Sequence, residues 1–501
     1  MTSVDDVLGL EGGPIVRAGA GRSVLDVLLH PESLAIIGAS DNPVSLGGRP
    51  LGLLAAAGYA GRVYPVNPTR STVQGRPAYP SVRDLPEPVE VAMVMVRARM
   101  VPAVLRECDA AGVRVAIVLS SGFGEGTGRG AELRDEIADI VAGTTMRVLG
   151  PNCEGLASLP ASAPLTFSPV LDAARTGQVV LPGKVAVLSH SGGLGFAVAQ
   201  WGSRVGIGFN YLISTGNEGD LDVLELAGAL LVETDTELAV LVLEGVDDPR
   251  RLAALAGQAR ELGKRLLVAR LGRTDAGARG SLAHTRHDAT TLGGLDALYA
   301  QQGIAQAGDE RELIDVLQAL DKVPTLAGRR IGILATSGGA GVWLADACRD
   351  AGLAVPELSP ELQHTLAGFM PEYGSPVNPV DLTAQFIAGG SFAPAIEALA
   401  SSGEVDAVVL ATSLASAGRL EDDREALSAL LQRDLPPLVV YTYTHPAESC
   451  VRILEGLGLA WYTSSTGVAG GLAAVAPPLA GGTGSPAADD TDARPAGGTL
   501  S

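Results

Sequence analysis

Aromatic residues and cysteine are both scarce in this sequence of 501 residues. Phe, Trp and Tyr make up 4% of the chain, so its cores have to be built mainly from Ala, Val and Leu. The four cysteines share no metal-ligand spacing, and no metal site is predicted on this chain. The N-terminus lacks the charged-then-apolar pattern of a secretory signal, and no run of about 20 apolar residues occurs. We therefore expect a cytoplasmic protein without a membrane span.

Positive charge is also in short supply, because 36 Lys and Arg stand against 56 Asp and Glu, a net charge of −20. A protein that binds duplex nucleic acid needs a basic face to neutralise phosphates, and no long basic run occurs here. This excludes nucleic acid as a predicted partner. A small anionic ligand is still compatible with the sequence, since helix N-termini and backbone amides supply local positive potential.

The sequence contains three blocks in which short apolar runs alternate with helix-like segments. In the first block, expected to form a domain over 1–150, this alternation predicts βαβ units around a parallel, Rossmann-like sheet. Two helix-like segments of this block lie at 101–112 and 130–143. Its apolar runs cover 33–40, 62–68, 91–96, 113–122 and 146–152.

The rest of the chain divides into two further α/β domains and two segments outside them. Residues 151–182 show little periodicity and are rich in Pro, Ala and Ser, which predicts a linker. The second and third blocks predict domains over 183–322 and 328–475. Residues 476–501 have almost no large apolar side chains and are expected to be a disordered tail.

Small and amide residues follow four of the strands predicted in the first block. A glycine at a strand end lets the backbone approach a phosphate, although the full G-x-G-x-x-G spacing is absent. Ligand sites of such sheets lie at the carboxyl ends of the strands, so these loops together favour a nucleotide-like site. The candidate residues are Gly38, Ala39, Ser40, Asn67, Pro68, Ser121, Gly122 and Asn152.

The order GAS…PVNP…SSGF…LGPNCEG resembles the CoA-binding domain of the NDP-forming acyl-CoA synthetases. That family includes ADP-forming acetyl-CoA synthetase and the α subunit of succinyl-CoA ligase, and the resemblance covers roughly 31–470. It implies a Rossmann-like CoA-binding domain followed by two flavodoxin-like α/β domains. It also implies that the eight candidate residues above bind CoA.

A serine- and glycine-rich loop opens the second block after the apolar run that begins at residue 184. Hydroxyls and N–H groups at the start of a helix form a phosphate cradle. The loop resembles the S-Q-S-G loop of the family, with His190 in place of Gln, and Thr215–Asp220 resembles the G-N-x-x-D loop beside it. The implied phosphate-binding residues are Ser189, Ser191, Gly192 and Gly193.

A second loop of small residues, 272–285, ends in the pair His284-Thr285. An imidazole there can act as a nucleophile or base near neutral pH. The loop resembles the S-H-T-G phosphohistidine loop, which places His284 as the phosphoryl acceptor and Glu244, after another strand, as its carboxylate partner. Arg286 stands where the family has Gly, and His287 is a less favoured nucleophile.

The resemblance implies a reversible reaction of acyl-CoA, phosphate and NDP to acid, CoA and NTP, through an acyl phosphate and phosphohistidine. No fourth block remains for an ATP-grasp domain, so ATP or ADP with Mg²⁺ is expected on a separate ATP-grasp β-type subunit, in a heterotetramer. The alternatives are a non-catalytic CoA-binding or regulatory protein, and an acyl- or carbamoyl-transferase that needs no nucleotide. An NAD-dependent dehydrogenase is disfavoured by the missing G-x-G-x-x-G and ribose-binding acid. The acyl substrate and the choice of ADP or GDP stay open.

Overall fold

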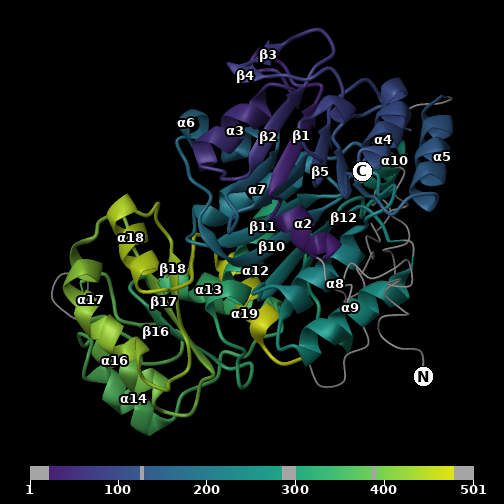
Figure 1. The fold of residues 1–501 in the computed structure, drawn as a ribbon. Coiled ribbons are helices and arrows are strands. Elements are labelled where there is room, and N and C mark those ends of the chain that lie inside the picture. Colours follow the sequence, from purple (N-terminus) through teal and green to yellow (C-terminus); the bar gives the residue numbers. More distant parts are fainter. Residues whose placement is uncertain are drawn as a thin grey trace, which may run out of the picture.

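The computed structural model describes residues 22–123, 129–246, 248–284, 299, 301–385 and 391–478. They form three α/β units that follow one another along the chain (Figure 1). The N-terminal 21 residues and nearly all of the predicted tail lie outside the described residues. Among the described helices, none has the length and apolar character needed to cross a bilayer.

The first unit is a parallel sheet in the order β2-β1-β5-β6-β7. Every residue of β1, β5 and β6 is buried, which requires helices on both faces. Its strands are β1 (Ser33–Ile37), β2 (Arg62–Val66), β5 (Val91–Val94), β6 (Val115–Val118) and β7 (Arg147–Leu149). Its helices are α2 (Val24–Leu29), α3 (Arg49–Ala57), α4 (Val101–Ala110) and α5 (Arg129–Ala142), and β3 (Thr72–Val73) pairs with β4 (Arg76–Pro77).

The second unit has a seven-stranded sheet in the order β14-β13-β12-β10-β11-β8-β9. One face packs against α7 and α12, and the other against α8 and α9. Its parallel strands are β10 (Pro182–Ser189), β11 (Phe209–Ser214), β12 (Leu238–Leu243), β13 (Arg265–Arg270) and β14 (Ala305–Ala307). Its helices include α7 (Gly192–Ser203), α8 (Val223–Glu233), α9 (Pro249–Glu261), α10 (Asp275–His284) and α12 (Glu310–Lys322).

The segment 151–182, expected to be a linker, contributes two strands to the second sheet. β8 (Gly155–Ser158) and β9 (Ala163–Thr166) form an antiparallel hairpin, and β8 pairs antiparallel with β11. Both strands have four residues and are fully buried, so they lack the polar–apolar alternation from which a strand is recognised. The expected linker is therefore part of the sheet, and only η4 (Pro169–Leu171), α6 (Ala173–Thr176) and short turns lie between it and β10.

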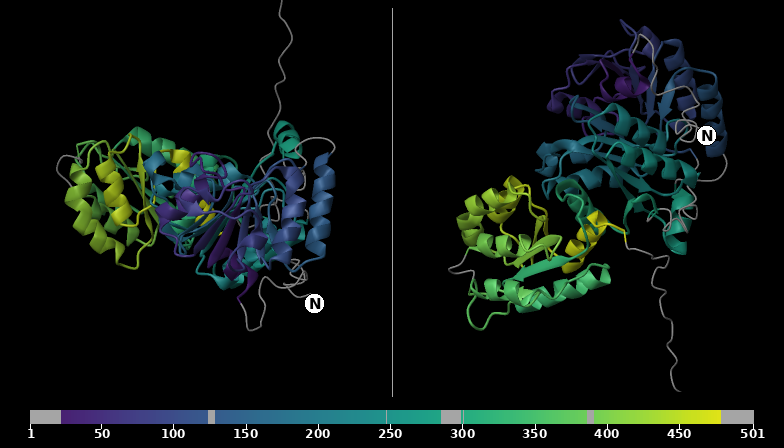
Figure 2. Two further views of the ribbon diagram at one scale, coloured as in Figure 1. Left: turned by 45° about the horizontal axis from the view of Figure 1, so that its top comes forward. Right: turned by 90° about the horizontal axis from the view of Figure 1, so that it is seen from below.

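The third unit is a five-stranded parallel sheet in the order β16-β15-β17-β18-β19, on the far side of the second unit from the first (Figure 2). It is joined to the second unit by packing of its helix α19 against α12. Its strands are β15 (Ile331–Ala335), β16 (Val380–Asp381), β17 (Ala407–Thr412), β18 (Leu438–Thr442) and β19 (Trp461–Tyr462). Its helices include α13 (Gly338–Asp350), α14 (Pro360–Ala367), α16 (Phe392–Ala400), α17 (Gly418–Leu431), α18 (Glu448–Gly456) and α19 (Ser465–Val475).

All three units share one topology. In each, the first parallel strand is central, with the second strand on one side and the third, fourth and fifth on the other. The connections reverse direction beside the first strand, and ligands of such sheets bind in the crevice at the carboxyl ends of the strands there. The predicted loops after β1 and β10 both lie at such switch points.

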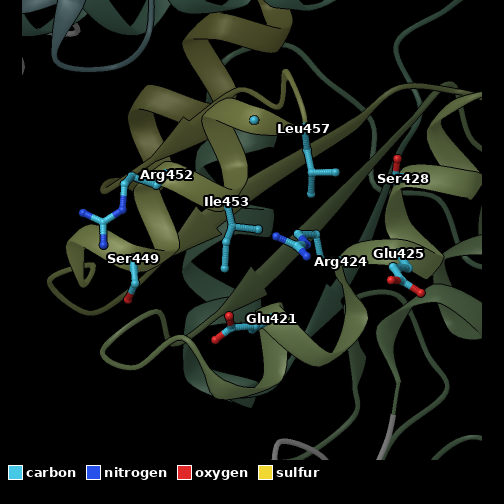
Figure 3. A pocket seen from close by; sticks show the side chains of 9 residues that line it. Glu421, Arg424, Glu425, Ser428, Ser449, Arg452, Ile453 and Leu457 are labelled. Carbon is cyan, nitrogen blue, oxygen red and sulfur yellow. The ribbon is translucent and has the colours of Figure 1, made fainter.

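A charged cavity of about 520 Å³ lies between α17 and α18 of the third unit (Figure 3). Arg424 and Arg452 line it together with Glu421 and Glu425, so cations and carboxylates balance. It lies on the helices and away from the carboxyl ends of the strands. For this reason we look for the reaction site in the first two units.

Candidate functional site

The loop after β1 is shaped by glycines that no other residue can replace without displacing backbone. Gly38 has φ +89°, and a Cβ at this position would lie 2.5 Å from the carbonyl oxygen of Met95, which follows β5. A Cβ on Gly47 would lie 2.3 Å from the carbonyl oxygen of Gly38. The backbone at the β1/β5 switch point is therefore bare and closely approached, as a phosphate-binding turn requires.

The other residues predicted to bind CoA lie at the same edge of the first sheet, with one exception. The side-chain amide of Asn67 donates to the carbonyl oxygen of Ala39 at 2.9 Å, so it holds the loop after β1 in place. Ser121 and Gly122, after β6, are exposed. Asn152 instead faces the second unit, because its amide donates to Oδ1 of Asn217 at 3.2 Å. The sequence did not indicate this direction.

The start of α7 differs from the other helices of the second unit. α8, α9 and α12 begin with aspartates whose carboxylates accept backbone N–H bonds. α7 has Ser191 at its N-cap without a side-chain capping bond, and it continues with Gly192 and Gly193. The first N–H groups of a helix have no partner within the helix. Those of α7 are left available for an anion.

Ser189, predicted as a phosphate ligand, is fully buried, and its hydroxyl donates to the carbonyl oxygen of Ser191 at 2.6 Å. Its hydroxyl is therefore already used to shape the loop. Ser191 and the two glycines are partly or fully exposed and remain the groups open to a ligand. The phosphate cradle remains a prediction, with residues 191–193 as its solvent-accessible part.

His190 is buried between the loops after β10, β11 and β12. Its Nδ1 accepts the backbone N–H of Glu244 at 3.1 Å, and its Nε2 lies 3.2 Å from Oε1 of Glu218. The hydrogen bonds assign the neutral ring as the tautomer with Nε2 protonated. Burial acts to lower the pKa of His190, but the carboxylates of Glu218, Glu244 and Asp222 outweigh it and raise that pKa. His190 therefore joins the phosphate loop to two neighbouring strand ends.

Substitutions of His190 test whether a glutamine, as in the family's S-Q-S-G loop, can make the same contacts with Glu244 and Glu218. In His190→Gln, the side-chain amide can accept from Glu244 and donate to Glu218, so we expect less than about 1 kcal/mol of destabilisation. In His190→Ala, both contacts and the ring volume are lost, and we expect about 2–4 kcal/mol. Urea unfolding followed by circular dichroism measures both. Equal losses in the two variants would contradict the paired role of the ring.

The two predicted catalytic residues are only partly placed. Glu244 follows β12 and is buried, with its backbone N–H directed to His190. His284 is the last residue of α10, and its side chain lies outside the description. Arg286 and His287 lie outside the described residues altogether. The pairing of Glu244 with His284 remains a prediction.

One carboxylate beside the cradle was not singled out from the sequence. Glu154 comes from the last loop of the first unit, and a Cβ on Gly192 would lie 2.8 Å from its Cβ and 3.0 Å from its Oε2. Burial raises the pKa of Glu154. It follows Cys153 in the LGPNCEG motif, so its motif membership was the available signal. Through Glu154, the first unit reaches the start of α7.

Comparison with known proteins agrees with this arrangement. The CoA binding domain model matches residues 32–158, the succinyl-CoA ligase like flavodoxin domain matches 182–320, and the Ligase-CoA domain matches 331–414. The α subunit of ADP-forming acetate–CoA ligase I of Pyrococcus furiosus is 35% identical over 367 residues, 72% of this chain and 76% of that subunit. The chain belongs to the NDP-forming acyl-CoA synthetase family.

A solved relative shares the fold of this chain, and another relative is about twice as long as the region that it shares with this chain. The dinucleotide-forming acetyl-coenzyme A synthetase 1 of Ca. Korarchaeum cryptofilum, in complex with phosphate and ADP, has a TM-score of 0.78 at 30% identity over 90% of this chain and 96% of that one. The ADP-forming 4-hydroxybutyrate–CoA ligase of Nitrosopumilus maritimus is 31% identical over 71% of this chain, which spans only 50% of that protein. The predicted family, order of α/β domains and enzyme class, an NDP-forming CoA ligase, are confirmed.

Proposed function

We propose that this chain performs the CoA and phosphoryl half of an acyl-CoA synthetase reaction, and that a partner subunit performs the nucleotide half. The observation that carries the proposal is the uncapped start of α7 at the switch point of the second sheet. It offers N–H groups for a phosphate beside Glu154, which lies in the last loop of the CoA-binding unit. Acyl-CoA and phosphate can therefore meet at one place.

The chemistry follows in three transfers. An oxygen of phosphate attacks the thioester carbonyl of acyl-CoA, the carbon–sulfur bond breaks, and CoA leaves as the thiol with a proton from phosphate. An imidazole nitrogen of His284 then attacks the phosphorus of the acyl phosphate, and the carboxylate of the free acid leaves with the bonding electrons. The phosphohistidine finally donates its phosphoryl group to NDP.

The chain's own residues have separate tasks in this scheme. Gly38 and its neighbours provide the bare backbone for the pyrophosphate of CoA. Residues 191–193 hold the transferred phosphate and stabilise the charge that develops on it. Glu244 accepts an N–H of His284, which fixes the tautomer and favours the cationic ring that forms on phosphorylation.

We further propose an ATP-grasp β-type subunit as the partner, in a heterotetramer, with Mg²⁺ bound together with its nucleotide. Two facts support this. A relative with 35% identity is named as a subunit α, and other relatives are about twice as long as the region that they share with this chain. If the purified chain alone made acyl-CoA from ATP, acid and CoA, the proposal of a partner would fail.

The central experiment uses the purified full-length chain, ³²P-labelled phosphate and a panel of acyl-CoAs. We expect a protein-bound phosphoryl group that is labile in acid and stable in base, formed only when an acyl-CoA is present. Release of one CoA thiol per phosphoryl group bound would confirm the stoichiometry. Free CoA release without labelled protein would instead indicate simple thioester hydrolysis.

A further inference from the structure

A second cavity, of about 170 Å³, lies between the second sheet and the two helices that cover one of its faces. Its lining is mostly apolar. The side chains come from α7 (Leu194, Val198, Trp201), from strands β12 and β13 (Val242, Ala269) and from α12 (Leu313). Val198, Val242 and Leu313 are almost completely buried, whereas Leu194 is 37% exposed. Leu194 therefore marks the side of the cavity that faces solvent.

This cavity adjoins the proposed phosphate cradle. Leu194 directly follows Gly193, so the cavity begins one residue beyond the groups that would hold phosphate. Its sheet residues reach the carboxyl ends of β13 and β14, at Arg270 and Gly308. In an acyl phosphate the acyl carbon is joined to phosphorus through a single bridging oxygen. A phosphate held on α7 thus places its acyl group beside this cavity.

We propose that this cavity receives the side chain of the acyl group, and that the enzyme favours apolar acyl groups larger than acetyl, such as branched aliphatic or phenyl-bearing ones. This inference rests on the proposed function. A dry apolar cavity of about 150 Å³ is sufficient to bind benzene, so the space suits a group of this size. Acetyl would leave most of it empty.

The charges at the rim argue against a dicarboxylic substrate. The charged residues that line the cavity are Arg270, Asp309 and Glu310, one cation and two carboxylates. A second carboxylate on the acyl group would gain no net attraction there and would lose its hydration. An apolar chain loses nothing at the rim and gains by burial against α7.

The test measures binding of phosphonates, which are stable mimics of acyl phosphates, to the full-length chain by isothermal titration calorimetry. We expect butyl- and benzylphosphonate to bind about tenfold or more tightly than methylphosphonate. Val198→Phe fills the cavity and should remove this gain while leaving methylphosphonate unchanged. The matched control is Val232→Phe, because Val232 is 53% exposed on α8, on the other face of the sheet. Circular dichroism verifies the fold of both variants.

If Val198→Phe does not fold, Leu194→Trp replaces it, because a tryptophan at this position narrows the exposed side of the cavity. Equal binding of methyl- and benzylphosphonate to the wild-type chain would overturn the acyl site and leave the phosphate cradle standing. A gain that persists in Val198→Phe or Leu194→Trp would place the acyl group elsewhere. If no phosphonate bound at all, the cradle itself and with it the proposed function would fail, which distinguishes the two failures.

Discussion

His284→Asn is expected to abolish the phosphorylated form of the protein. Asparagine keeps the polarity and approximate size of the side chain but has no nucleophilic nitrogen, so transfer from the acyl phosphate should fall about a thousandfold or more. The measurement is incorporation of labelled phosphate in the presence of an acyl-CoA. CoA affinity, measured by calorimetry, should stay within about twofold, because the CoA loops belong to the first unit.

The matched control is His287→Asn, a substitution of the same type three residues further along the chain. It should label as the wild-type chain does. The opposite pattern, with label lost in His287→Asn and kept in His284→Asn, would move the nucleophile. Label retained in both would mean that another residue of the chain carries the phosphoryl group.

Arg147→Met is expected to have the largest effect on stability. Arg147 lies on β7 of the first unit, and its guanidinium pairs with Asp220 at 2.9 Å and with Glu225 at 3.1 Å in the second unit. All three side chains are at most 17% exposed. Removing the cation from two poorly hydrated carboxylates should destabilise the protein by about 3–5 kcal/mol, measured by urea unfolding.

The control for this prediction restores charge balance without the ion pairs. In Arg147→Met combined with Asp220→Asn and Glu225→Gln, none of the three charges of this cluster remains, and a large part of the lost stability should return. If the triple variant were less stable than Arg147→Met, packing around the guanidinium would outweigh its charge. Because the hydrophobic cluster that includes Leu25 and Leu226 also spans both units, we expect them to unfold together.

The sequence predicted features that depend on nearest neighbours in the chain. Gly38 and Gly192 were found because small residues follow a strand closely there, and the structure keeps both at switch points. The partners of Arg147 and His190 were not predicted. They lie 73 and 78 residues from Arg147 and 28 and 54 residues from His190, and no periodic pattern links partners over such distances. The hydrogen bond donated by the Ser189 hydroxyl was not predicted for a related reason, since only the folded loop brings it to the carbonyl oxygen of Ser191.

The β8–β9 hairpin bears on where this chain can be cut. The hairpin follows the first unit in sequence, but β8 covers the edge of β11, a strand whose six residues are all buried. A recombinant fragment that began at residue 183 would leave the hydrogen-bonding groups of β11 exposed, as an edge that other molecules can extend into aggregates. A fragment that began just before Gly155 would bring its own edge protection. Expression of the second and third units as a separate piece should therefore start upstream of the hairpin.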